Sequence, residues 1–246
     1  MIVVPEKVVF IKTPKSASTT IANLFWSRHQ VDRGALLGPE VATAIRYLVC
    51  LDGLAPKIPV LNGNWFYNRS LLFGWHASYE DLTHIFGDRL NEYHWIASVR
   101  HPVARLFSVY SSQLSKGHLI EELTPQNFEA FCERVFSRHP DLSLHQCIHT
   151  ASQSSWLPPV GKGPRVSLVR KENLAEDIAR LSKYVPSFQD CALAHENLSF
   201  KGDLARYVSP ALAGRIEDFY AEDMERLKYR SLVREETGVS QHGTCR

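Results

Sequence analysis

Residues 7 to 11 (KVVFI) form a continuous run that is rich in β-branched and aromatic residues, and a polar loop follows it. Such a run is typical of a strand buried on both faces, as in a parallel sheet. Beyond the loop, Ile21, Leu24 and Phe25 recur at helical spacing, and hydroxyl residues stand just before them. Hydroxyl side chains are suited to cap a helix. The stretch therefore predicts a strand, a loop and a hydroxyl-capped helix from about Thr19 to His29.

The same alternation of strand and helix continues along the chain. Further strands are predicted over residues 71–73, 95–99 and 166–169. Helix starts are marked by a capping box at Ser78 and Asp81, by an N-cap before proline at Thr124 and Ser209, and by Asn173. This order predicts an α/β fold, in which a mostly parallel central sheet is flanked by helices and binds ligands at the carboxyl ends of its strands.

The chain has 246 residues, of which 44% are hydrophobic, so it can bury a sizeable core. We expect a single domain over 1–246. Residues 34–70 contain several turn-forming residues and predict an irregular insertion with one helix near 41–50, and residues 236–246 predict a flexible tail. Five widely spaced cysteines without a CxxC pair predict free thiols in a reducing compartment.

Charge and hydropathy limit the classes of partner. The formal net charge of +2 is too small to favour nucleic acid as a partner, so an anion site must come from local arrangement of charge. No apolar stretch approaches the roughly 20 residues that span a bilayer, and the first residues do not resemble a signal peptide. The sequence predicts neither a nucleic-acid partner nor a transmembrane segment.

The loop "KTPKSASTT", residues 12–20, has the chemistry of an anion site. A loop between a buried strand and a helix exposes backbone N–H groups at the positive end of the helix dipole, and Lys15 with the following hydroxyls reinforces it. The loop contains no glycine, which argues against an ordinary ATP or GTP loop. In "SVRHPVARLFSVY", Arg100 and Ser108 lie where the next strand meets its helix. These stretches predict two anion sites that flank one cleft. The same sequence would also be compatible with a capped helix that carries a solvated lysine, and with an arginine on the surface.

Taken together, these stretches resemble the sulfotransferases that use 3′-phosphoadenosine 5′-phosphosulfate (PAPS), especially the carbohydrate branch. "KTPKSASTT" resembles their 5′-phosphosulfate loop, and "VRHPVARLFSVY" resembles their 3′-phosphate segment. "LVRKENLAEDIARL" and "YVSPALAGRIEDFYAEDMERLKY" resemble later parts of the family, so that the likeness covers residues 7–30 and 71–230 in order. The resemblance implies that the following residues bind PAPS: Lys15, Ser16, Ala17, Ser18, Thr19, Thr20, Arg100, Ser108 and, in a loop that closes over the nucleotide, Ser199 and Lys201.

The resemblance also implies a reaction. The sulfuryl group of PAPS, as co-substrate, would pass to a hydroxyl of a carbohydrate by in-line displacement, with Lys15 stabilising charge on the departing phosphate oxygen. We expect no metal, because a single sulfonate needs less neutralisation than a triphosphate and the sequence shows no carboxylate placed like that of a Walker B motif. His76, in "FGWHASYEDL", matches a family histidine and is expected to be the general base. Glu80, one helical turn on, would orient His76 or replace it as the base.

Several alternatives remain open from the sequence. The acceptor could instead be a protein tyrosine, a lipid or a small phenol, and the other classes of function are an atypical P-loop kinase and a non-catalytic nucleotide-binding module. In "HQCIH", His145, Cys147 and His149 are metal-ligand types, but no fourth ligand accompanies them and a structural role is favoured. The start of the chain favours a cytoplasmic enzyme of bacterial type over a Golgi-luminal catalytic domain that lacks its anchor.

Overall fold

The computed structural model describes residues 1–3, 6–29, 65–68, 71–74, 77–189, 191 and 204–235. The chain divides into two compact units. Unit 1 consists of Met1–Arg100 and Ser155–Asn197, and unit 2 consists of His101–Ser154 and Leu198–Arg246. The prediction of one domain over the whole chain stays a prediction.

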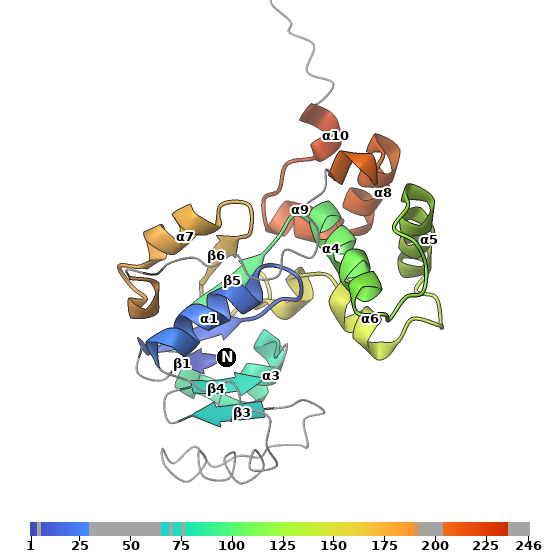
Figure 1. Ribbon diagram of the computed structural model, residues 1–246. Coiled ribbons are helices and arrows are strands. Elements are labelled where there is room, and N and C mark those ends of the chain that lie inside the picture. Colours follow the sequence, from blue (N-terminus) through green and yellow to red (C-terminus); the bar gives the residue numbers. More distant parts are fainter. Residues whose placement is uncertain are drawn as a thin grey trace, which may run out of the picture. The chain divides into compact units, whose positions relative to one another are not determined.

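The strands of unit 1 form one sheet in the order β3-β4-β1-β2-β5-β6 (Figure 1). They are β1 (Ile2–Val3), β2 (Val8–Ile11), β3 (Trp65–Asn68), β4 (Leu71–Gly74), β5 (His94–Val99) and β6 (Val166–Arg170). β2, β5 and β6 are parallel, with Phe10 opposite Ile96 and Ala97 opposite Leu168. β1 pairs antiparallel with β2 and β4, and β3 pairs antiparallel with β4. The three parallel strands therefore bring three carboxyl ends to one edge of the sheet.

The α/β class predicted from the sequence is confirmed, and so are the strands expected at 7–11, 71–73, 95–99 and 166–169. Two further strands, β1 and β3, were not predicted, and both belong to the antiparallel part of the sheet. β3 lies inside the span 34–70, for which the sequence predicts irregular structure. The helix expected near 41–50 and the tail 236–246 lie outside the described residues.

Helices pack on the faces of the sheet in unit 1. These are α1 (Ser18–Arg28), α3 (Tyr79–Phe86) and α7 (Leu174–Leu181), and short 3₁₀ turns lie at Gly87–Leu90 (η3) and Pro186–Phe188 (η5). Phe10 of β2 packs with Phe25 of α1 and lies in one core with α7 and η5. Successive strand residues point to opposite faces. Trp95 is the residue next to Ile96 and therefore points to the opposite face of the sheet. There it packs on Tyr79 of α3 at a ring separation of 5.4 Å, and its indole N–H donates to Leu90 O at 3.1 Å. The parallel strands are thus covered on both faces.

Unit 2 is helical in its described residues. Its helices are α4 (Pro102–Ser115), α5 (Pro125–Phe136), α6 (Leu144–Thr150), α8 (Pro210–Phe219), α9 (Ala221–Arg226) and α10 (Leu232–Glu235), with a 3₁₀ turn at Leu204–Arg206 (η6). A further 3₁₀ turn, η4 (Ser154–Trp156), begins at the last residue of this segment of unit 2 and continues into unit 1 along the chain. The core of unit 2 joins α4, α5 and α8: Phe107 meets Phe128 edge to face at 5.1 Å, and Ile216 is fully buried. Apolar burial of this kind is the main stabilising contribution to such a unit.

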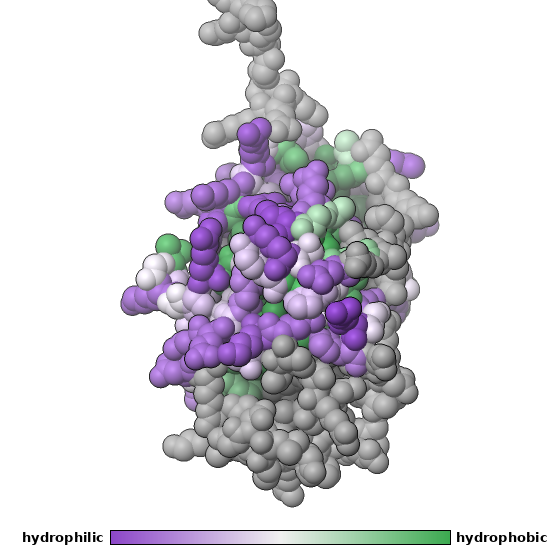
Figure 2. All heavy atoms as spheres, turned by 90° about the vertical axis from the view of Figure 1, so that its left-hand side faces the viewer, coloured by the Kyte–Doolittle hydropathy of each residue, from purple (hydrophilic) through white to green (hydrophobic). Residues whose placement is uncertain are grey.

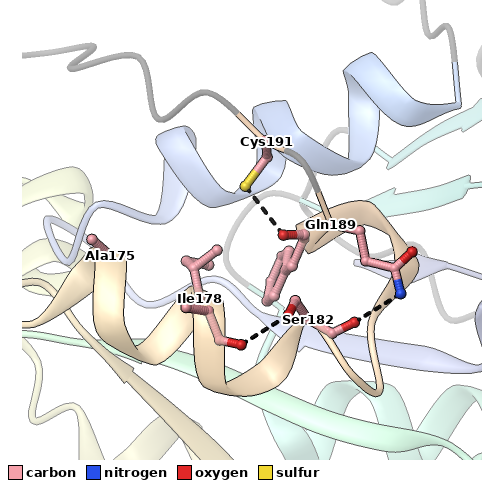
Figure 3. Close-up of a pocket in the computed structure, with 7 residues that line it drawn as sticks. Ala175, Ile178, Ser182, Gln189 and Cys191 are labelled. Atoms are coloured by element: carbon pink, nitrogen blue, oxygen red, sulfur yellow. Dashed lines mark hydrogen bonds between the residues drawn. The ribbon is translucent and has the colours of Figure 1, made fainter.

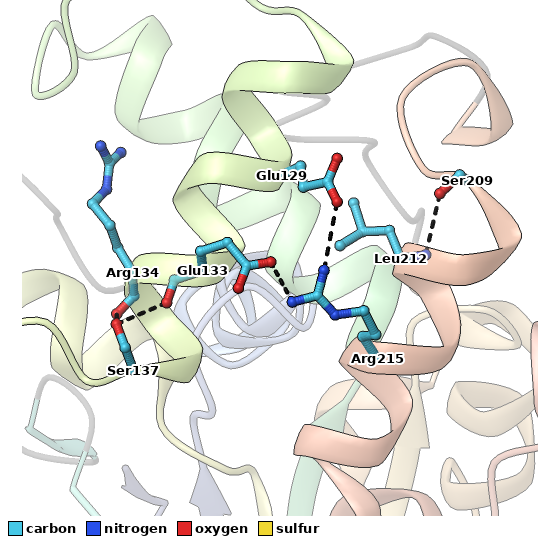
Figure 4. A network of polar contacts seen from close by, with 7 residues as sticks. All are labelled: Glu129, Glu133, Arg134, Ser137, Ser209, Leu212 and Arg215. Atoms are coloured by element: carbon cyan, nitrogen blue, oxygen red, sulfur yellow. Dashed lines mark hydrogen bonds and ion pairs between the residues drawn. The ribbon is translucent and has the colours of Figure 1, made fainter.

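The N-caps predicted from the sequence for α5 and α8 are confirmed. Thr124 accepts a hydrogen bond from Asn127 N at 3.1 Å, and Ser209 accepts one from Leu212 N at 3.1 Å, each before a proline at the first helical position. On their exposed sides, Arg215 of α8 points to two glutamates of α5 (Figure 4). Exposed pairs of this kind add only about 0–1 kcal/mol each, so the buried contacts account for most of the packing of α5 on α8.

A buried carboxylate holds the turn after α6. Asp223 of α9 accepts hydrogen bonds from Gln153 N at 2.8 Å, Ser154 N at 2.7 Å and Ser152 Oγ at 2.6 Å. Asp223 is fully buried, so these donors stand in for the water that a carboxylate would otherwise need. The turn 152–154 is therefore fixed from within unit 2.

The described residues are mostly polar on the face that Figure 2 shows. Hydrophilic side chains predominate there, and hydrophobic ones occur in small separate groups. The described residues include several exposed large apolar side chains, of which Ile120 and Val160 are the most exposed. Scattered apolar side chains are normal on the surface of a soluble domain and do not by themselves mark a binding patch.

Candidate active site

The loop between β2 and α1 has a strained backbone. Lys15 and Ala17 both have a φ of 63°, in the left-handed region that residues other than glycine seldom adopt. Each such residue costs on the order of 1–3 kcal/mol and persists only when its surroundings enforce it. The loop reaches, without glycine, a backbone conformation that glycine would adopt at lower cost.

Three hydroxyl side chains enforce this conformation. Ser16 Oγ lies 2.7 Å from Ser98 Oγ and 2.7 Å from Thr13 Oγ1, and it donates to Thr13 O at 2.8 Å. Thr13 Oγ1 also donates to Ser98 O. All three residues are buried, and Ser98 belongs to β5. The loop is therefore fastened to the neighbouring parallel strand.

The prediction that a hydroxyl residue caps α1 is wrong. The residue at the N-cap is Ala17, and no side chain caps the helix within the described residues. Ser16, the hydroxyl nearest to the cap, is turned towards Ser98, and Ser18, Thr19 and Thr20 lie within the first turn. An uncapped N-terminus leaves backbone N–H groups available to an external acceptor at the positive end of the helix dipole. Because Ser16 bonds to Ser98 and does not cap α1, the start of this helix is suited to bind an anion.

Two lysines belong to this loop, and they lie in different surroundings. Lys12 is 2% exposed, and its Nζ lies 5.9 Å from the ring centroid of Trp26. Lys15 is only half-buried. Lys15 is therefore the more accessible of the two lysines.

Arg100 and Lys171 directly follow the next two parallel strands. Val99 of β5 is the register partner of Arg170 of β6, and Lys171 N donates to Val99 O at 2.9 Å. Arg100 and Lys171 are both half-buried. Burial, and to a lesser extent the positive charge of Arg100, lower the pKa of Lys171, while Glu172 acts in the opposite direction. Two cations are therefore close enough to influence each other at this edge of the sheet.

The structure describes some of the remaining predicted site residues but not others. Ser108 lies on α4 of unit 2 and is buried, and Glu80 lies exposed in the first turn of α3. The capping box expected at the start of α3 is confirmed, since Ser78 Oγ accepts from Asp81 N at 3.1 Å. The predicted base His76, and Ser199 and Lys201, lie outside the described residues.

The motif with His145, Cys147 and His149 lies on α6. The two imidazole rings are 3.9 Å apart, and His149 Nδ1 lies 2.8 Å from His145 O. Among the described residues, no group of three or more His, Cys, Asp or Glu side chains is arranged to hold a metal ion. Contacts within α6 and with Gln113 of α4 account for the positions of these histidines.

A pocket of about 550 Å³ lies beside α7 in unit 1 (Figure 3). Its lining residues are Ala175, Ile178, Ala179, Ser182, Phe188, Gln189 and Cys191. Gln189 Nε2 donates to Ser182 O at 3.1 Å, and Cys191 Sγ donates to Phe188 O at 3.3 Å. These described residues carry no charged side chain, so this pocket lacks the cations that phosphate groups require.

The model of the sulfotransferase family matches residues 1–230, which include the loop, all six strands and both cations at the strand ends. The chain belongs to the sulfotransferase family. It is therefore a PAPS-dependent enzyme that transfers a sulfuryl group to a hydroxyl-bearing acceptor. No match was found among curated proteins or among solved structures. Within the described residues of this sulfotransferase, no helix combines the length and the apolar character needed to cross a membrane.

Sequence reasoning missed three residues that the structure places at the loop and at the strand ends. Thr13 and Ser98 fasten the loop, and Lys171 stands beside Arg100. Ser98 was detectable as a lone hydroxyl near the end of the otherwise apolar strand "WIASV". Lys171 follows its strand as Arg100 follows the preceding strand, but only the register of β5 and β6 brings the two together.

Proposed function

We propose that the loop between β2 and α1 binds the 5′-phosphosulfate of PAPS, and that Arg100 and Ser108 bind its 3′-phosphate. The observation that carries the proposal is the uncapped start of α1, held open by the bond between Ser16 and Ser98. Backbone N–H groups there, with the hydroxyls of Ser18, Thr19 and Thr20, provide donors for an anion. In the same proposal, Ser199 and Lys201 contact the nucleotide from a loop that closes over it.

Lys15 supplies the charge that sulfuryl transfer requires. The acceptor oxygen bonds to sulfur while the bond between sulfur and the 5′-phosphate oxygen breaks, so negative charge grows on that phosphate oxygen. A cation placed there stabilises the transition state more than the ground state. The half-buried position of Lys15 supports this role, since a partly dry site strengthens the interaction.

His76 accepts the proton of the acceptor hydroxyl as that oxygen attacks. Neutral imidazole can do so near pH 7, because its unperturbed pKa is about 6.5. The match of "FGWHASYEDL" to a family histidine supports this role. Glu80, in the first turn of α3, orients His76 or serves as the base in its place.

A carbohydrate hydroxyl is the proposed acceptor. Support comes from the resemblance of the phosphosulfate loop and the arginine segment to the carbohydrate branch of the family. A protein tyrosine, a lipid and a small phenol are the competing acceptors, and the position sulfated is set by residues that the motifs do not identify.

Two measurements test the proposed function. Calorimetry should give much tighter binding of 3′-phosphoadenosine 5′-phosphate (PAP) than of ADP, and a preference for ADP would contradict the donor assignment. Radiolabelled PAPS should transfer its label to polysaccharides or glycolipids rather than to tyrosine peptides or phenols. Label only on peptides or phenols would leave the donor assignment intact and refute the carbohydrate acceptor.

A further inference from the structure

Lys171 occupies the position on β6 that Arg100 occupies on β5. Each residue directly follows its strand, and the two strands are parallel and in register at Val99 and Arg170. The bond from Lys171 N to Val99 O extends this pairing by one residue beyond β6. Because neighbouring strands lie about 4.8 Å apart, the two cationic residues leave the sheet side by side.

Such a placement brings two like charges close together at one end of the sheet. Both side chains are half-buried, which weakens their hydration. Burial and the charge of Arg100 both lower the pKa of Lys171, so its ammonium form is less favoured than it would be in water. Among the described residues, the carboxylate of its neighbour Glu172 acts in the opposite direction. A bound anion would reverse this balance.

We propose that Lys171 and Arg100 together bind one phosphate monoester, the 3′-phosphate of PAPS. This inference rests on the proposed function, which places Arg100 at that phosphate, and it adds a residue to the site. A phosphate monoester carries nearly two negative charges at pH 7, since its second pKa is about 6. The sulfuryl end of the phosphosulfate carries a single charge. Two adjacent cations therefore match the 3′-phosphate better than they match the sulfuryl group.

The test compares two nucleotides that differ only in the 3′-phosphate, namely PAP and AMP. Calorimetry is performed on the full chain and on Lys171→Met, Lys171→Arg and Lys162→Met. Lys162 is an exposed lysine of the same unit, so Lys162→Met makes the same change in net charge away from the strand end. Thermal unfolding without nucleotide checks each variant for folding.

Lys171→Met should bind PAP about 10- to 100-fold more weakly than the parent, the range of a charge-assisted hydrogen bond, with AMP binding unchanged. Lys171→Arg should retain most of the affinity for PAP, and Lys162→Met should match the parent. Without nucleotide, Lys171→Met should be at least as stable as the parent, because it removes a disfavoured charge.

Three results would count against Lys171. Equal PAP affinity of Lys171→Met and the parent would overturn the inference, and so would an equal loss of PAP and AMP affinity. Failure of Lys171→Arg to restore binding in a folded variant would do the same. A parent that binds PAP no better than AMP is a different outcome, because it would refute the proposed 3′-phosphate site as a whole.

Discussion

Ser16 and Ser98 are 82 residues apart in the sequence, and their hydroxyl oxygens lie 2.7 Å apart in a buried hydrogen bond. This bond ties the loop that carries Lys15 to the strand that ends just before Arg100. The proposed phosphosulfate loop and the proposed 3′-phosphate arginine are therefore positioned by the same strand, β5.

The first prediction concerns this bond. Ser16→Ala and Ser98→Ala should each weaken PAP binding, and the double variant should lose less than the sum of the two single losses. The expected coupling is about 0.5–3 kcal/mol, as for residues of one hydrogen-bond network. A double-mutant cycle measured by calorimetry checks it, and strictly additive losses would show that the loop does not depend on this contact.

Replacement of Lys15 should affect turnover rather than folding. Lys15→Ala should lower kcat by about 10²–10³-fold, the usual effect of removing one group that stabilises transition-state charge. Its melting temperature without nucleotide should stay close to that of the parent, because Lys15 is only half-buried. Lys162→Ala, at an exposed site, serves as the control. A kcat near the parent value would remove Lys15 from the catalytic step.

The left-handed backbone of Ala17 predicts a contrast between two substitutions. Ala17→Gly should keep the loop conformation, because glycine adopts a φ of 63° without steric cost. Ala17→Val should destabilise the loop by about 1–3 kcal/mol and weaken PAP binding, because a β-branched side chain strongly disfavours this region. Urea unfolding and calorimetry would show the difference. Equal behaviour of the two variants would mean that the conformation of residue 17 does not matter to the site.

The predicted base is tested by the dependence of the rate on pH. His76→Ala should lower kcat by about 10²–10⁴-fold and abolish the acid limb of the pH profile, while PAP affinity stays nearly unchanged. Glu80→Gln should cause a smaller loss if Glu80 only orients His76. A His76→Ala enzyme that keeps its acid limb, together with a Glu80→Gln enzyme that loses it, would assign the base to Glu80.

The buried carboxylate of unit 2 predicts a large effect on stability. Asp223→Ala leaves the N–H groups of Gln153 and Ser154 without their acceptor, at about 1–3 kcal/mol for each buried group. Asp218→Ala removes an exposed carboxylate from α8, and it should change the free energy of unfolding by less than about 0.5 kcal/mol. Chemical denaturation of the two variants compares them directly, and similar midpoints would contradict the structural role of Asp223.

Local signals in the sequence predicted the elements whose starts are stabilised locally. The caps at Ser78, Thr124 and Ser209 were correct because each binds a backbone N–H three residues ahead. The cap predicted for α1 was wrong because Ser16 bonds to Ser98, and a contact between residues so far apart in the sequence cannot be predicted from local patterns.

Long-range pairing explains the other differences. β1 has two residues and gains its partners only from β2 and β4, so no periodic pattern could reveal it. α6 was not predicted either, although its start carries a local signal, the capping box of Ser143 and Gln146. Of the proposed site, the sequence indicated Lys15 and Arg100 as separate cations, whereas the place of Lys171 beside Arg100 follows only from the register of β5 and β6.

The hydrogen bonds between hydroxyl groups that hold the proposed phosphosulfate loop also determine how it responds to pH and salt. Thr13, Ser16 and Ser98 are neutral at every pH at which the protein is folded, so neither protons nor added salt should alter the shape of the loop. Ionic strength instead screens the interaction of Lys15, Arg100 and Lys171 with an anion. Nucleotide affinity should therefore fall as salt rises, while the structure that receives the nucleotide stays the same.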